Sequence, residues 1–287
     1  MKKCFLKKFC NLVFFFKNKD PRVAHVNLNG VIGRDSKFDK GLNFENIFPL
    51  LQNAFNTDGI KAVAISINSP GGSPVQSELI YKGIRELSEE KKIPVYTFAQ
   101  DVAASGGYWL LLSGDEIYAH SSSIIGSIGV IFSGFGFVDA IKKIGIERRI
   151  YAEGKNKSIL DPFTPENQDN ISILKQAQKD IFESFKELVI TRRRGKISTE
   201  IDFLDNNIFT GAFWSGKTSR DLGLIDEICD MRQKMKEKFG AKVKIITIEN
   251  KKGFIKSLFA SKSNDDVVLN IINRIEEKIL MQNFGLK

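Results

Sequence analysis

The chain has 287 residues, 42% of them apolar and 27% charged, with 23 Gly and 7 Pro. This composition is typical of a soluble globular protein and excludes the collagen-like, disordered and disulfide-scaffold classes. No run reaches the roughly 18 consecutive apolar residues of a membrane-spanning helix. Three cysteines, two of them at the extreme N-terminus, and two histidines offer neither a disulfide framework nor a CxxC zinc site. We therefore expect a reducing compartment, no metal and no cofactor.

The net charge of +9 is distributed unevenly along the chain. Residues 1–19 hold six Lys and no acidic residue, and residues 231–256 hold nine Lys or Arg against two Glu. The body between these two segments is net acidic. Because a nucleic-acid-binding protein concentrates positive charge on the domain that binds, we expect no nucleic-acid partner.

The first 19 residues, MKKCFLKKFCNLVFFFKNK, place Phe and Leu at helical spacing and most of the Lys off that face. A basic amphipathic helix suits an anionic membrane surface. We expect peripheral membrane contact and a location in the cytoplasm or on the cytoplasmic membrane. A cleavable signal peptide is disfavoured, because Lys7 and Lys8 interrupt the apolar stretch and no small-x-small site follows. A helix packed on the domain is the alternative.

Hydrophobic periodicity predicts strands that alternate with helices along the body of the chain. This alternation indicates βαβ units and a mostly parallel sheet, followed by a helical part. The predicted strands are 23–28, 62–67, 94–99, 116–119 and 244–248. The predicted helices are 44–56, 75–87, 104–113, 138–144, 166–194 and 217–222.

Two strand-to-helix junctions carry glycine pairs, Ser69-Pro70-Gly71-Gly72 and Ala104-Ser105-Gly106-Gly107. In an open α/β sheet such junctions lie at the carboxyl ends of the strands, where ligands bind. Backbone amides at these junctions point outward, as an oxyanion hole requires. Ser105 is therefore either a helix N-cap or a nucleophile. A phosphate cradle is a weak alternative, because neither GxxxxGK[ST] nor GxGxxG occurs near these strands.

Four ordered motifs resemble the bacterial signal peptide peptidase A family, a branch of the Clp-protease/crotonase superfamily. They are NSPGG at 68–72, DVAASGGYWLLLSGDEIYA at 101–119, IGSIGV at 125–130 and GKNKSILDPFT at 154–164. A closing match runs from FTG at 209–211 to LGLIDE at 222–227. The resemblance implies an α/β fold of stacked βαβ units with a helical C-terminal part. We divide the chain into a membrane-associating segment 1–19, a peptidase domain 20–230 and a basic extension 231–287.

The resemblance further implies a Ser–Lys dyad, with Ser105 as nucleophile and Lys157 as general base, and Lys155 as the local competitor. Ser127 matches a serine that orients the lysine. The oxyanion donors are the amides of Gly72 and Gly106, and Gly71 could replace Gly72. A lysine with its ordinary pKa near 10.4 is protonated at neutral pH, so a base must be desolvated. Catalysis by His120 or His25 is the disfavoured alternative, since no family motif places a catalytic histidine there.

The expected function is that of a serine endopeptidase acting on short unfolded or membrane-released peptides, such as signal-peptide remnants. In the family the lysine comes from a neighbouring subunit, so we expect a homo-oligomeric ring or dome. Members commonly carry an N-terminal membrane anchor, which the segment 1–19 replaces here. The alternatives are a catalytically silent membrane-associated scaffold and a crotonase-like acyl-CoA enzyme. The basic tract 192–196 is interpreted as a solvated helix end or a subunit contact rather than an RNA contact.

Overall fold

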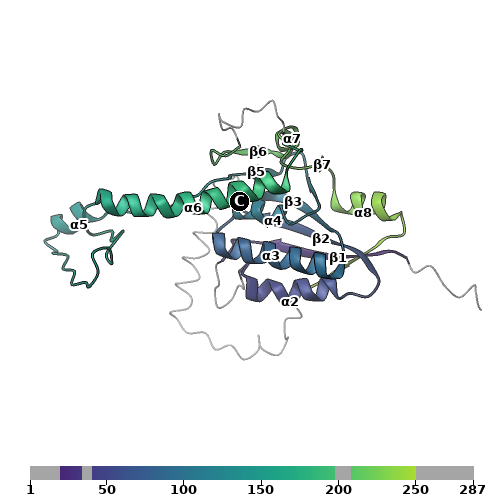
Figure 1. The fold of residues 1–287 in the computed structure, drawn as a ribbon, viewed down its shortest axis with the longest axis horizontal. Coiled ribbons are helices and arrows are strands. Elements are labelled where there is room, and N and C mark those ends of the chain that lie inside the picture. Colours follow the sequence, from purple (N-terminus) through teal and green to yellow (C-terminus); the bar gives the residue numbers. More distant parts are fainter. Residues whose placement is uncertain (1–19, 34–40, 198–207, 250–287) are drawn as a thin grey trace, which may run out of the picture.

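A mostly parallel sheet forms the centre of the computed structural model, which describes residues 20–33, 41–197 and 208–249 (Figure 1). Its main path runs in the order β6-β5-β3-β2-β1-β8; β4 branches from β3 and pairs in turn with β7. The pairs between described strands are parallel except β5 with β6. The strands are β1 (Arg22–Asn29), β2 (Ile60–Ser69), β3 (Val95–Ala104), β4 (Glu116–Ala119), β5 (Ile124–Gly126), β6 (Phe213–Ser215), β7 (Glu227–Ile228) and β8 (Lys244–Thr247).

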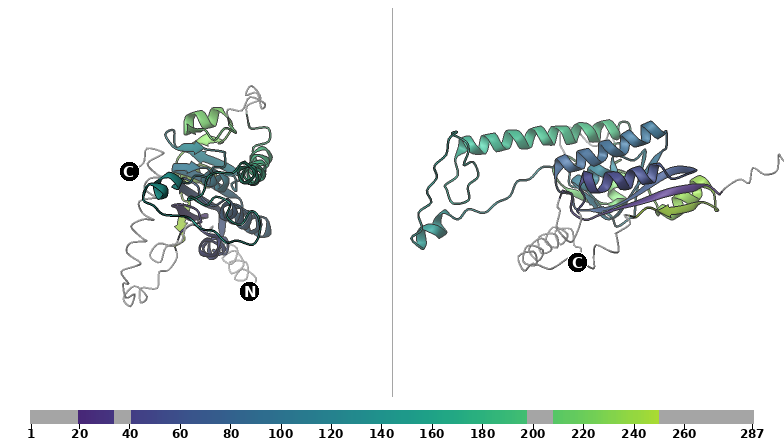
Figure 2. Two further views of the ribbon diagram at one scale, coloured as in Figure 1. Left: turned by 90° about the vertical axis from the view of Figure 1, so that its left-hand side faces the viewer. Right: turned by 90° about the horizontal axis from the view of Figure 1, so that it is seen from below.

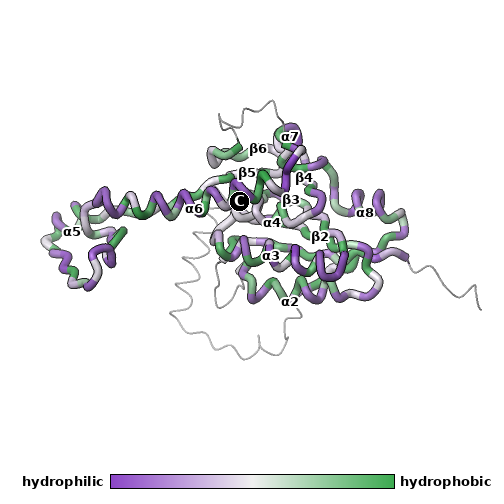
Figure 3. The backbone as a smooth tube through the Cα atoms, viewed as in Figure 1, coloured by the Kyte–Doolittle hydropathy of each residue, from purple (hydrophilic) through white to green (hydrophobic). Residues whose placement is uncertain are grey.

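Helices cover both faces of this sheet, as Figure 2 shows. On one face α2 (Phe44–Phe55) and α3 (Pro74–Lys91) bury the larger apolar core together with α4 (Gly106–Leu111). On the other face α8 (Met231–Phe239) covers a smaller cluster that includes Phe98, Tyr118 and Met235. The alternation of hydropathy along α2 and α3 matches their one-sided burial (Figure 3). These layers confirm the expected α/β fold with a mostly parallel sheet.

An arm formed by residues 131–181 projects from the sheet (Figures 1 and 2). It contains α5 (Val138–Lys143) and most of α6 (Gln168–Arg192), a helix of 25 residues and therefore about 37 Å long. The buried residues of α6, Phe185 and Val189, both lie in its last third, and α5 has none. The arm therefore extends away from the body of the protomer and makes few packing contacts with it.

The predicted elements are found, with shifts at the central junction. β3 continues to Ala104, and α4 begins at Gly106 rather than at 104. The reason is tertiary: Ala103 and Ala104 pair with Ile125 and Gly126 of β5. Four further elements were not predicted: β5, β6, β7 and α8. α7 (Gly216–Asp221) lies close to its predicted place, whereas the predicted segment 1–19 lies outside the described residues.

Arg192, the last residue of α6, and Arg193, its C-cap, are bound within the protomer, which corrects their interpretation as part of a solvated helix end. Arg194 is exposed, and a subunit contact of this tract stays a prediction. Arg192 donates to the carbonyls of Leu112 at 2.9 Å and Gly114 at 2.7 Å. The side chain of Arg193 is 2% exposed and lies 3.0 Å from Asp226, whose other oxygen is 2.8 Å from Lys196. This cluster anchors the base of α6 to the chain that follows α7.

We expect Asp226→Asn to lower the free energy of unfolding by about 3–5 kcal/mol at pH 7, because it leaves Arg193 buried beside a neutral group. Burial raises the pKa of Asp226, but the hydrogen bonds from Arg193 and Lys196 outweigh it and hold the pKa below 3.8. The stabilisation is thus present above about pH 4 and disappears as the pH falls further, where the wild type also becomes neutral. Urea unfolding at pH 7 and pH 3 measures both effects.

The matched control for this substitution is Asp221→Asn. Asp221 is paired with Arg220 at 2.7 Å, but both side chains are about half exposed. An exposed ion pair contributes at most about 1 kcal/mol. Equal effects of the two substitutions would show that the buried cluster has no special role.

Candidate active site

Ser105 links the end of β3 to the start of α4 in a backbone conformation that side chains rarely adopt, with φ 52° and ψ −120°. It occupies the N-cap position, yet its side chain makes no capping hydrogen bond. Its amide donates to the carbonyl of Gly126 at 2.8 Å, and its carbonyl accepts from Trp109 at 3.0 Å. Strain of this kind persists only where the surroundings hold it, and it is common at active sites. Ser105 is half-buried and its hydroxyl is not used as a cap, so it remains a candidate nucleophile.

The two glycine junctions are in direct contact. A Cβ on Gly71 would lie 2.8 Å from the Cβ of Ser105 and 2.9 Å from the amide nitrogen of Gly106. A Cβ on Gly72 would lie 2.1 Å from the carbonyl oxygen of Ile32. Glycine is required at both positions because the neighbouring backbone occupies the space of a side chain. This packing brings the NSPGG segment against the nucleophile candidate.

The amides at these junctions differ in their hydrogen bonds. The amide of Gly71 donates to Ser69 Oγ at 3.2 Å. Ile32 forms a bridge with Gly72 through the two residues that flank Gly72. The Ile32 amide donates to the Gly71 carbonyl at 2.8 Å, and the Ile32 carbonyl accepts from the Ser73 amide at 2.9 Å. Within the described part of the chain the amides of Gly72 and Gly106 have no partner, the latter because helix-initial amides lack one. These two amides, one from each glycine junction, are candidate donors to an oxyanion.

Ser127 directly follows β5, as Ser105 directly follows the neighbouring strand β3. The register pairs Ala104 with Gly126, so each serine is the next residue of adjacent parallel strands. Ser127 is also half-buried with φ 52°, and its amide donates to the carbonyl of Ala212 at 2.7 Å. The pairing of β3 with β5 therefore brings two of the predicted site residues together.

Lys157 is not brought to Ser105 within one protomer. It is an exposed residue of the segment that joins α5 to α6, at the far end of the arm (Figures 1 and 2). Its amide donates to the carbonyl of Gly154 at 3.0 Å, which forms a turn. The competitor Lys155 lies on the same segment and is 3.6 Å from Asp169. A site made of Ser105 and Lys157 would therefore need the lysine of another protomer.

Neither histidine contacts Ser105 in the described structure. His25 lies in β1, and its Nε2 is 2.9 Å from the buried Ser66 Oγ. Burial, with a smaller contribution from Arg232, lowers the pKa of His25. His120 follows β4 as an exposed residue whose amide donates to Ser123 Oγ. The geometry gives no support to a Ser–His site.

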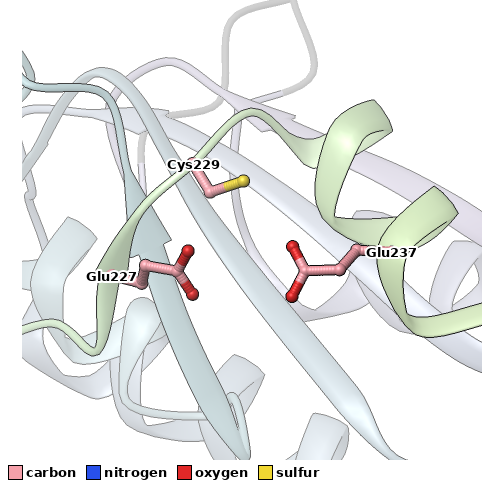
Figure 4. A group of neighbouring side chains, drawn as sticks. All are labelled: Glu227, Cys229 and Glu237. Atoms are coloured by element: carbon pink, nitrogen blue, oxygen red, sulfur yellow. The ribbon is translucent and has the colours of Figure 1, made fainter.

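Glu227, Cys229 and Glu237 form a cluster between β7 and α8 (Figure 4), with ligand-type atoms within 4.8 Å of one another. The ammonium of Lys234, whose side chain is 4% exposed, lies 2.6 Å from Glu227 and 2.9 Å from Glu237. A cation of the chain itself thus compensates the two carboxylates. Other basic residues of this region are also paired internally, Lys238 with Glu116 and Lys244 with Asp20.

Residues 88–244 match the sequence model of the family described as "Peptidase family S49". The chain belongs to this family. The match covers the Ser105 junction, the arm and strands β3 to β7, whereas β1, β2 and the NSPGG segment lie outside it. It confirms the resemblance to signal peptide peptidase A and agrees with the Clp/crotonase-like fold of the S49 peptidases.

Curated relatives share this S49 region within longer proteins. The "Na(+)/H(+) antiporter NhaA" of Brucella abortus (strain 2308) is 44% identical over 241 residues, 84% of this chain and 32% of that protein. "Protease 4" of Haemophilus influenzae is 32% identical over 217 residues, 74% of this chain and 33% of that protein. "Serine protease SPPA, chloroplastic" of Arabidopsis thaliana is 29% identical over 188 residues, 64% of this chain and 26% of that protein.

The S49 chain spans about a third of the length of these relatives. The name "antiporter" describes a longer protein, and this chain matches only 32% of that protein's length. Among the described helices, none combines the length and the hydropathy needed to span a bilayer.

Proposed function

We propose that the chain is a serine endopeptidase for short unfolded or membrane-released peptides, signal-peptide remnants among them. Ser105 is the nucleophile and Lys157 the general base. The observation that carries the proposal is the Ser105 junction, where a strained serine makes no capping bond and the adjoining glycine junctions offer two amides that have no partner among the described residues. Membership of peptidase family S49 supports the same chemistry.

The reaction follows from these groups. Ser105 Oγ attacks the scissile carbonyl carbon while neutral Lys157 Nζ accepts the hydroxyl proton. The oxyanion accepts hydrogen bonds from the amides of Gly72 and Gly106. Lys157 returns the proton to the leaving amine as the C–N bond breaks, which leaves an acyl-enzyme. The lysine then takes a proton from a water that attacks the ester carbonyl, and returns this proton to Ser105 Oγ as the C–Oγ bond breaks and the acid product leaves. Ser127, beside Ser105, orients the lysine by accepting or donating a hydrogen bond.

The exposed position of Lys157 supports a homo-oligomer, a ring or dome, in which the lysine of one subunit enters the site of the next. The arm exposes a set of large apolar side chains that an isolated protomer leaves in water, and a subunit interface would bury them. The same burial would desolvate the lysine, as a base requires. These side chains are Ile131, Phe132, Phe135, Phe137, Ile144, Ile146, Ile150, Tyr151, Leu160, Phe163 and Ile173.

Peripheral membrane contact through residues 1–19 stays a prediction, since that segment lies outside the described residues. It would place the enzyme where signal-peptide remnants are released. A location in the cytoplasm or on the cytoplasmic membrane is part of the same proposal.

A fluorophosphonate probe tests the nucleophile without any substitution. We expect one adduct per subunit by intact mass and, after digestion, its location on Ser105, because an activated serine reacts where other hydroxyls do not. Denatured protein is the control and should take no label. A folded, oligomeric protein that takes no label would contradict the peptidase and would favour the silent scaffold of the same fold.

A further inference from the structure

A cluster around Asp161 shapes the segment that carries Lys157. Arg148 places Nε 3.1 Å and Nη2 2.7 Å from Oδ2 of Asp161. The amide of Phe163 donates to Oδ1 at 2.9 Å. The Asp161 side chain is 10% exposed, although the arm around it is open to solvent. Its carboxylate is thus held from two sides by two different parts of the segment.

Further contacts tie this cluster to the start of α5. The amide of Phe137 donates to the carbonyl of Pro162 at 2.6 Å. The rings of Phe137 and Phe163 stack with their centroids 5.6 Å apart, and the guanidinium of Arg148 lies 5.8 Å from the centroid of Phe163. Residues before and after Lys157 therefore meet at Asp161.

Lys157 stands on a series of turns that ends at this aspartate. The amides of Lys157, Ile159 and Asp161 donate to carbonyls three residues earlier, at 3.0, 3.3 and 3.2 Å. Leu160, next to Asp161, has a φ of +64°. A leucine in this conformation is strained, so the contacts of its neighbour must hold the turn. Within the described structure no partner holds the Lys157 side chain, so its direction depends on this backbone.

We propose that Asp161 is a positioning residue for Lys157: bound by Arg148 and by the amide of Phe163, it fixes the turn that presents the lysine to the neighbouring Ser105. The inference rests on the proposed function and adds a residue that touches neither the substrate nor the nucleophile. Displacement of a catalytic group by about 1 Å costs on the order of 10²-fold in rate. A turn that loosens around Lys157 should therefore slow the reaction without changing the fold.

The chain contains a matched control for this ion pair. Arg149 contacts Glu147 with the same distances, 3.1 Å from Nε and 2.7 Å from Nη2 to a single carboxylate oxygen. Both side chains of that pair are exposed, at 68% and 71%. The Glu147 carboxylate accepts no backbone amide in the described structure. Removing Glu147 thus deletes an ion pair from the same segment without releasing the turn.

The test is the rate at which a fluorophosphonate labels Ser105 in the full-length oligomer, followed by intact mass. We expect Asp161→Ala to slow labelling by about tenfold to a hundredfold, and Glu147→Ala to change it by less than about twofold. The pH profile of Asp161→Ala should approach that of Lys157→Ala, because both lack a positioned base. The native mass and the Tm should stay those of the wild type.

Labelling of Asp161→Ala at the wild-type rate would overturn the proposal. Slow labelling with a smaller assembly or a lower Tm would overturn it too, since Asp161 would then only support the fold. Arg148→Ala should slow labelling to a similar extent, and the double variant should be no slower than Asp161→Ala; additive losses would contradict a shared role. If Lys157→Ala is labelled at the wild-type rate, the dyad itself is refuted. If Lys157→Ala is labelled slowly while Asp161→Ala is labelled at the wild-type rate, only the positioning role of Asp161 is refuted.

Discussion

Replacing Ser105 by alanine is expected to abolish peptide hydrolysis and leave the fold intact. The rate should fall by at least about 10³-fold, because no other nucleophile can form the acyl-enzyme. Stability should change by less than about 1 kcal/mol. The Ser105 side chain makes no capping bond, and alanine has the same Cβ, so the strain at φ 52° is unchanged.

The measurement is hydrolysis of a short fluorogenic peptide together with the Tm of each protein. Ser122→Ala, in the exposed turn after β4, is the control and should keep full activity. Turnover by Ser105→Ala at the wild-type rate would remove Ser105 from the mechanism. If Ser105→Ala is inactive and its Tm is also much lower than that of the wild type, the loss of activity would be explained by a damaged fold.

Both Lys157→Ala and Lys157→Arg are expected to be inactive. Alanine removes the base, and the guanidinium of arginine does not lose its proton under any useful condition. The loss should be about 10²- to 10⁴-fold, the usual contribution of a general base. The pH profiles of both variants should differ from that of the wild type, because their remaining activity depends on hydroxide instead of a positioned base.

Lys155→Ala is the control for this prediction, because Lys155 lies two residues away on the same exposed segment and is paired with Asp169. It should retain activity within about twofold. Steady-state kinetics between pH 6 and pH 10 compares the variants. An inactive Lys155→Ala beside an active Lys157→Ala would mean that the base is the other lysine.

Much of the fold could be predicted from local patterns. β4 lies at its predicted bounds, and α3 begins at Pro74, one residue before its predicted start, with Ser73 as its N-cap. β5, β6 and β7 could not be predicted, because they have only two or three residues each and exist through pairing with other strands. The extension of β3 to Ala104 has the same cause, since an alanine-rich stretch suits a strand or a helix until β5 lies beside it.

The candidate site was only partly predictable from the residues themselves. The glycine junctions indicated where Ser105 and the amides would lie, because close backbone approach demands glycine. Ser127 and Lys157 came from the family resemblance, since no local spacing relates them to Ser105. The projection of the arm could not be predicted, because the hydrophobic periodicity of a helix does not show whether its apolar residues pack on the protomer or face water. Asp161 carried no signal beyond its place in the motif, and its role depends on Arg148, thirteen residues earlier.

Mixing the two inactive proteins tests the shared site most directly. Ser105→Ala and Lys157→Ala subunits are combined under conditions of subunit exchange, and native mass spectrometry confirms mixed oligomers. If Lys157 crosses to its neighbour, a Ser105→Ala subunit still supplies a lysine to an adjacent Lys157→Ala subunit that retains its serine. Random mixing at equal amounts should then restore about a quarter of the wild-type sites. Mixed oligomers that remain inactive would contradict the shared site, because a dyad within one chain leaves every subunit with a lesion.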